Sequence, residues 1–162
     1  MSTAYHAGPD WLKAVEARET SETLERDAVR QREAAAALQV KMSASGFFQN
    51  LHEQLTLAVA ALDPTKRDGS VTAWGSSEYE QGVRVSIRRN GIIAKQTYTD
   101  LIYTKGQAFI RCNTVEGMSF LLSFCVNGEG EICVTASKSP MVMDHRQAAR
   151  FIVEPMMNLT KL

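Results

Sequence analysis

Three arginines stand at positions that could bring their side chains to one face of a β-sheet. Arg84 and Arg88 alternate with apolar residues in the segment 83–88, so strand alternation would send them away from the apolar side. Arg111 joins them if its apolar neighbours in the sequence point toward a core. Guanidinium groups bind phosphates and carboxylates through paired hydrogen bonds. These arginines predict a face that binds an anionic ligand or a nucleic acid, although we favour the simpler interpretation of a solvated sheet face.

The segment KGQAFIRC, residues 105–112, satisfies five of the eight positions of the strand that contacts RNA in RNA-recognition domains. Gln107 and Cys112 replace aromatic positions, so Phe109 is the ring left to stack on a base. Such domains also have helices between their first two and last two strands, whereas the segments around 105–112 indicate hairpins. We therefore interpret the segment as a turn and a strand, identify no protein family, and expect Phe109 to be mostly buried.

The adjacent residues Asp144 and His145 suggest a catalytic pair, with Cys125, Cys133 or a serine as the nucleophile. Neighbouring residues on a helix point about 100° apart, so Asp144 does not orient His145, and capping a helix is the simpler role for its carboxylate. The other histidines have no metal-binding spacing. The sequence predicts no catalytic residue, no metal site and no cofactor, and a small enzyme ranks third among the functions considered.

The composition is typical of a globular protein without net charge. The chain has 162 residues, of which 44% are hydrophobic, with 18 basic and 18 acidic side chains. A dedicated nucleic-acid-binding protein usually carries an excess of base, so nucleic acid is a partner that we do not favour. Three cysteines inside apolar stretches indicate free thiols. The sequence shows neither a long apolar run nor a signal-peptide pattern, so we expect a cytoplasmic protein without membrane contact.

The first third of the sequence is typical of helices, because residues 11–42 contain no proline and no glycine. Apolar residues recur there at steps of three and four, interrupted by Gln31, which is the spacing of a seam along one side of a helix. The helical seam consists of Leu24, Ala28, Ala35, Leu38 and Met42. Residues 16–23 lack large apolar side chains and predict an exposed, frayed or broken stretch. Residues 43–46 predict a turn or a bend before a second apolar stripe at 48–62.

The middle of the sequence predicts an antiparallel sheet. Residues 63–70 are expected to form a loop, and from Val71 onward the apolar residues follow a period of two. Asn90-Gly91 and Asn127-Gly128 are strong signals for hairpin turns, with a strand returning from Ile92 after the first. Consecutive hairpins predict a meander of five or six strands.

The end of the sequence predicts a helix over about 145–153, begun by Asp144 as its N-cap. Pro155 predicts the start of a further turn, because proline disrupts a helix interior. The order of these elements predicts an α+β fold with N-terminal helices, an antiparallel meander sheet and a C-terminal helix. We expect the helix at 48–62 and the final helix to cover one face of the sheet.

The expected organisation is a helical arm, residues 1–42, followed by an α+β domain, residues 43–162. A single chain of this size need not bury the helical seam. We therefore expect a non-catalytic interaction or scaffold protein that forms a homo-oligomer or binds a protein partner through the arm. Binding of an anionic ligand or a nucleic acid to the arginine-bearing sheet face is the alternative.

Overall fold

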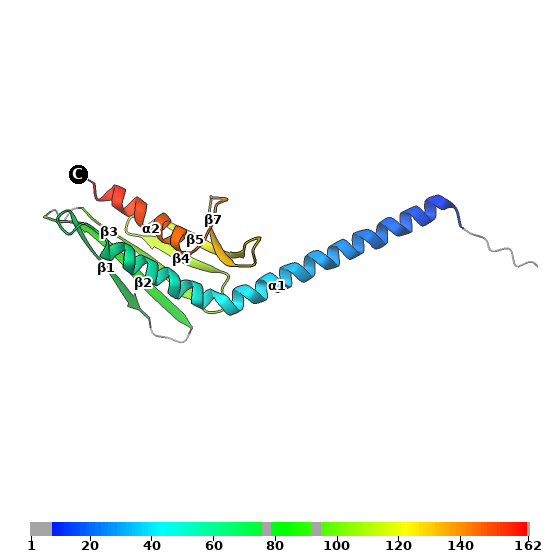
Figure 1. The fold of residues 1–162 in the computed structure, drawn as a ribbon, viewed down its shortest axis with the longest axis horizontal. Helices are drawn as coiled ribbons and strands as arrows, with labels where there is room; N and C mark the ends of the chain where they lie inside the picture. Colours follow the sequence, from blue (N-terminus) through cyan, green and yellow to red (C-terminus); the bar gives the residue numbers. More distant parts are fainter. Residues whose placement is uncertain (1–7, 76–78, 92–94, 162) are drawn as a thin grey trace, which may run out of the picture. The chain divides into compact units, whose positions relative to one another are not determined.

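A computed structural model describes residues 8–75, 79–91 and 95–161 of the chain. The chain divides into two compact units between Ala37 and Leu38, and each unit is described by itself. The first unit contains the beginning of helix α1, which runs from Asp10 to Ala60. The second unit contains the end of α1, seven strands and helix α2, in the order shown in Figure 1.

Helix α1 is continuous from Asp10 to Ala60, so neither a break within residues 16–23 nor a turn at residues 43–46 interrupts it, and residues 16–23 are exposed, as expected. The hydroxyls of Thr20 and Thr23 donate hydrogen bonds to the carbonyl oxygens four residues earlier, at 2.9 Å each. In this geometry the two side chains bond to the helix rather than competing with it. A single glycine, Gly46, costs only about 1 kcal/mol in a helix interior, and the surrounding buried residues offset that cost.

The sheet is an antiparallel meander in which the spatial order of the strands follows the chain order. Its strands are β1 (Arg67–Trp74), β2 (Glu80–Arg89), β3 (Gln96–Thr104), β4 (Phe109–Thr114), β5 (Ser119–Val126), β6 (Ile132–Ala136) and β7 (Val142–Met143). The α+β class and the meander are confirmed, with seven strands in place of the five or six expected.

The additional strand length lies at the two edges of the sheet. Strand β1 begins at Arg67, inside the segment expected to be a loop, because Arg67–Ser70 pairs with the end of β2. The polar and glycine residues of this segment gave no period-two pattern, and pairing with a long neighbouring strand overrides their weak propensity. Strand β7 has only two residues, Val142 and Met143, which is too short for a periodic signal.

The hairpin turns lie where the asparagine–glycine pairs predicted them. Between β5 and β6, the side-chain oxygen of Asn127 accepts hydrogen bonds from the backbone nitrogens of Glu129 and Glu131. Gly130 supplies the left-handed backbone conformation of this turn, with φ at 80°. Asn90 and Gly91 form a turn after β2, but the expected strand start at Ile92 lies outside the described residues.

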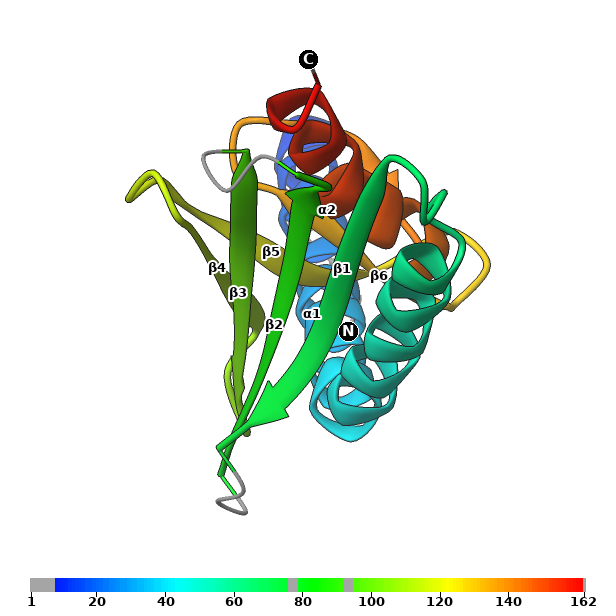
Figure 2. The same ribbon diagram turned by 90° about the vertical axis from the view of Figure 1, so that its left-hand side faces the viewer.

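Both helices pack on the same face of the sheet, as expected (Figure 2). Alternation along the strands sends Val85, Leu101 and Ile110 to this face, and all three are fully buried. Helix α1 contributes Leu51 and Leu55 to the same core. The other sheet face is not covered by either helix, and we call it the outer face.

Aromatic rings connect α1 to the sheet at the centre of the core. Phe47 contacts Phe124 with ring centroids 5.7 Å apart and nearly perpendicular planes. Phe48 lies 5.7 Å from Tyr103, and Tyr103 lies 5.9 Å from Phe124. The two pairs that include Phe124 are edge-to-face, and such pairs add to the stabilisation from burial alone. These contacts place the residues after Ala44 of α1 firmly on the sheet.

Helix α2 spans His145–Leu159, and its N-terminus has the predicted cap. The Asp144 carboxylate accepts a hydrogen bond from the Gln147 backbone nitrogen at 2.8 Å, and the Gln147 side chain accepts one from the Asp144 backbone nitrogen. The expected end of the helix before Pro155 is wrong, since α2 continues through it. Pro155 is exposed, and its missing N–H removes one hydrogen bond from the backbone ladder of the helix.

Substitution of Gly69 should test how closely α1 approaches the sheet. A Cβ atom at Gly69 would lie 2.7 Å from the carbonyl oxygen of Ser86 and 3.0 Å from a methyl group of Val59. The backbone oxygen belongs to the β1–β2 ladder and cannot move freely. We expect Gly69→Ala to lower the free energy of unfolding by about 1–3 kcal/mol in urea denaturation.

Gly128→Ala is the matched control, because a Cβ at Gly128 would meet no atom within 4 Å. We expect this variant to unfold at the same urea concentration as the parent or slightly higher, since alanine restricts the unfolded chain. Equal stability of the two variants would show that α1 does not lie against Gly69 as described.

Candidate functional site

The helical seam is exposed along α1. The exposed fractions of its three large side chains are 65% for Leu24, 58% for Leu38 and 76% for Met42. Ala35 is also exposed and Ala28 is half-buried. Leucine and methionine side chains at these positions leave apolar area in water that a partner helix would remove.

Arg84 lies on the outer face, as its alternation predicted, but its charge is paired. Its Nε donates to Oδ1 of Asp100 at 2.7 Å, and a second guanidinium nitrogen donates to Oδ2 at 2.8 Å. The guanidinium carbon also lies 4.2 Å from the centre of the Tyr98 ring. The hydrogen bonds to Asp100 raise the pKa of Arg84 above its ordinary value.

Arg88, on the same strand β2, forms the same kind of pair with a carboxylate of the neighbouring strand β1. Its Nε and Nη2 donate to the two carboxylate oxygens of Asp68 on β1, at 3.1 and 2.7 Å. The Arg88 hydrogen bond lowers the pKa of Asp68, so this carboxylate stays ionised over the physiological range. Paired in this way, Arg84 and Arg88 present much less free positive charge than the sequence indicated.

Arg111 has an apolar environment on the same outer face. Its register partners are Ile102 on β3 and Leu121 on β5. Arg111 is exposed, and the described residues provide it with no hydrogen bond or ion pair. Phe109 lies two residues away on this face and is mostly buried, as expected, although not completely. The three arginines thus share a face, as predicted, but Arg111 alone retains an unpaired charge within the described part of that face.

The cysteines are spread over both sheet faces. Cys112 is fully buried in the core, and burial raises the pKa of its thiol above the ordinary value. Cys125 and Cys133 face each other across β5 and β6, and burial raises the pKa of both. Thiols with raised pKa values carry little thiolate at neutral pH, so none of the three is an activated nucleophile.

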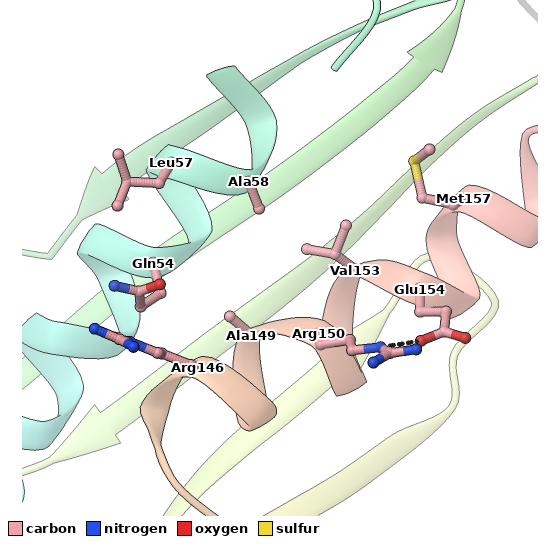
Figure 3. Close-up of a pocket in the computed structure, with 9 residues that line it drawn as sticks. All are labelled: Gln54, Leu57, Ala58, Arg146, Ala149, Arg150, Val153, Glu154 and Met157. Carbon is pink, nitrogen blue, oxygen red and sulfur yellow. Dashed lines mark hydrogen bonds and ion pairs between the residues drawn. The ribbon is translucent and has the colours of Figure 1, made fainter. Parts of the chain in front are cut away.

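An open groove of about 480 Å³ lies between the end of α1 and helix α2 (Figure 3). Leu57 and Ala58 of α1 border it on one side, with Val153 and Met157 on α2. Arg150 on α2 is paired with Glu154 at 2.8 Å, in the i, i+4 arrangement of a helix surface. This pair is well exposed and stabilises the helix only weakly.

A second and larger cleft, of about 570 Å³, lies beside α2 near the start of β3 and the β4–β5 hairpin. We call it the α2 cleft. Its apolar wall includes Phe120, Phe151 and Met156, and the rings of Phe120 and Phe151 are 5.8 Å apart. Thr97 and Thr99 of β3 also line it. The cleft is mostly apolar with a few polar groups, a composition typical of small-molecule sites.

Sequence reasoning missed the α2 cleft. The signal available was the alternation in QTYTD, residues 96–100, which sends Thr97 and Thr99 to the same face as the buried Leu101. Two polar residues at core positions of a strand are a departure from the apolar pattern. The sequence placed the final helix on this face but indicated that it ends before Pro155, so the part of α2 beyond Pro155 that lines the cleft was not predicted.

The predicted histidines and acidic residues do not form a reaction centre. Asp144 caps α2, while the His145 ring contacts the Phe47 ring at 6.3 Å between centroids. His52 lies on α1, and His6 lies outside the described residues. Across residues 8–75, 79–91 and 95–161, no group of three or more His, Cys, Asp or Glu side chains is placed to hold a metal ion.

Comparison with protein families, curated proteins and solved structures finds no significant match to this chain. The helices within the described ranges are also not long and apolar enough to cross a membrane. The class of the protein therefore rests on its own architecture, an α+β domain in which two helices cover one face of a seven-stranded meander.

The outer face yields a test of anion binding. If it binds polyanions through charge, Arg84→Ala combined with Arg88→Ala should lower the salt concentration at which the protein elutes from heparin. Because both arginines are already paired with aspartates, we expect this decrease to be smaller than that caused by Arg111→Ala alone. A parent protein that is not retained on heparin at low salt would exclude the outer face as a polyanion-binding site.

Proposed function

We propose that this protein is a non-catalytic interaction protein that self-associates through the helical seam of α1. The observation that carries the proposal is the exposure of Leu24, Leu38 and Met42 at helical spacing on one continuous helix. Scattered apolar residues on a surface need no explanation, but a row of them along one helix side indicates a partner helix.

The energetics of helices support the same proposal. Except for Ala28 and Ala36, which are half-buried, every residue of α1 from Asp10 to Ala37 is exposed. Helical stability in proteins comes mostly from packing of an apolar side rather than from intrinsic propensity. A helix of this length that buries almost nothing gains stability when a second helix covers its seam.

The composition of the helical seam favours a second copy of the chain in antiparallel orientation. Placing Ala28 against Leu38 of the second copy brings Leu24 against Met42 and Gln31 against Ala35. Each layer then joins a large side chain to a smaller or flexible one, which allows the helices to approach closely. This register uses every seam residue of both copies.

Charges beside the seam agree with this register. Asp27 and Lys41 precede seam residues on the same flank, and in the antiparallel pair each Asp27 meets Lys41 of the second copy. Arg32 meets its counterpart, which is an unfavourable contact of a few tenths of a kcal/mol at an exposed site. In a parallel pair in register, Asp27 and Lys41 would be about 21 Å apart along the helix axis.

Leu38→Asp should weaken self-association. A carboxylate at the centre of the helical seam would lose hydration on contact with an apolar partner helix, and this loss costs free energy. We expect the parent to sediment as a dimer and Leu38→Asp to sediment closer to the monomer mass. The dissociation constant of the dimer should rise at least tenfold in this variant.

Val29→Asp is the matched control, because Val29 is exposed on α1 but points about 140° away from Leu24. This variant should keep the mass of the parent. A monomeric parent at high micromolar concentration, or equal effects of Leu38→Asp and Val29→Asp, would contradict self-association through the seam.

Charge reversal should reveal the orientation of the pair. Asp27→Lys and Lys41→Asp should each weaken the dimer, because each creates like charges across the interface. The double variant exchanges the two charges and should restore the parent dissociation constant in sedimentation at low salt. Added salt should reduce the effect of all three variants.

Restoration by the double variant requires that residues 27 and 41 of different copies meet. A double variant that dimerises more weakly than both single variants would exclude this antiparallel register. Association through the helical seam would then still be decided by the Leu38→Asp test. Binding to an unrelated protein would also not be restored, since the partner would keep its original charges.

A further inference from the structure

The α2 cleft contains hydroxyl groups that the fold itself does not use. Thr97 and Thr99 lie on the core face of β3, with exposed fractions of 4% and 3%. Within the described part of the chain, neither side chain takes part in a hydrogen bond. Among the described residues, every side-chain nitrogen or oxygen that is closed off from solvent has a hydrogen-bond partner. Because the two threonine hydroxyls have none, their oxygens must be open to the cleft that they line.

Unused hydroxyls at such burial are unusual for a packed core. Buried polar groups are normally hydrogen-bonded, so a ligand that displaces water from the cleft must itself supply hydrogen bonds to these hydroxyls. Thr114 pairs with Thr99 across the β3–β4 ladder, but its hydroxyl donates to the Met118 carbonyl oxygen at 3.2 Å. The other polar residues of the lining, such as Ser119 and Asn158, are exposed, so the two β3 hydroxyls are the deeply buried free polar groups of the cleft.

We propose that the α2 cleft binds a neutral small molecule that has an apolar chain and a terminal hydroxyl or carbonyl group. The apolar chain would lie against Phe120, Phe151 and Met156, and the polar end would hydrogen-bond to Thr97 and Thr99. A hydroxyl side chain both donates and accepts, so it suits either an alcohol or a carbonyl. This inference does not depend on self-association through α1.

The charges around the α2 cleft favour a neutral ligand. Its inner polar groups are hydroxyls, which cannot neutralise a carboxylate or an ammonium group taken out of water. The charged lining residues, Glu116 and Lys138, are opposite in sign and both exposed. A charged ligand end could therefore remain at the cleft opening but would gain nothing by reaching the threonines.

The volume and the rim of the α2 cleft suit a ligand of this size. About 570 Å³ lies within the range of small-molecule sites. Val115, Met118 and Leu159 line the cleft and remain exposed, which leaves apolar area for a bound chain to cover. Methionine side chains adapt to ligands of different shape.

The methyl groups of methionine provide a local readout. Met118 and Met156 line the α2 cleft, whereas Met42 and Met141 are exposed elsewhere on the described chain. In protein labelled with ¹³C at methionine methyls, we expect 1-decanol to shift the signals of Met118 and Met156 and to leave Met42 and Met141 unchanged. Decanoate, with the same chain and a charged end, should bind at least several-fold more weakly.

Thr97→Val combined with Thr99→Val removes the two hydroxyls and preserves side-chain shape, so the fold should persist. We expect this variant to bind 1-decanol about tenfold more weakly, as two hydrogen bonds of ordinary strength would give. It should bind the apolar probe N-phenyl-1-naphthylamine as tightly as the parent. Thr135→Val, a half-buried threonine of the outer face, is the control and should not change either affinity.

Three outcomes would overturn the proposal. The first is equal shifts of all four methionine signals, which would indicate non-specific contact of the alcohol with apolar surface. The second is unchanged 1-decanol affinity in the double valine variant, and the third is decanoate binding as tight as that of 1-decanol. Either of these would exclude recognition by the threonine hydroxyls. Melting of the labelled protein, measured in parallel, separates loss of binding from loss of fold.

Discussion

The fold depends on covering one face of a single sheet with helices from the two ends of the chain. A sheet with one apolar face is stable only when another layer buries that face. Here α1 supplies Leu51 and Leu55, and α2 supplies Ile152 and Met156, to the same core. Because both helices are committed to this face, the outer face must be acceptable to water. The paired arginines and aspartates on β1, β2 and β3 meet that requirement without leaving strong excess charge.

The sequence predicted the parts of the fold that depend on local periodicity. The alternation in residues 83–88 placed Val85 inside and Arg84 outside, and Asp144 marked the start of α2. What it did not predict depends on partners distant in the sequence. Arg67–Ser70 becomes a strand because β2 lies beside it, and α2 continues through Pro155 because its other side is packed on the sheet. Local propensity was overridden by tertiary contacts in both cases.

Candidate sites were predictable to different degrees for the same reason. The helical seam needs only helical spacing, so the sequence contained it in full, including Leu38 and Met42. The arginine face needed only strand alternation, but the pairing of Arg84 with Asp100 follows from the β2–β3 register. The α2 cleft requires a strand, a hairpin and a helix that are far apart in the chain. No pattern within a single segment indicates such a cleft, although the threonines at core positions of β3 mark where it lies.

One helix serves both the core and the helical seam, because the two use different sides of it. Six residues separate Met42 from Phe48, which is a rotation of about 240° around the helix axis. Phe48 is buried against the sheet while Met42, within the same compact unit, is largely exposed. A break near Gly46 would have allowed the two stripes to adopt unrelated directions. Because α1 is continuous, the core contacts of Phe47 and Phe48 also fix the direction in which Leu38 and Met42 face. The packing of α1 on the sheet therefore keeps this end of the helical seam exposed.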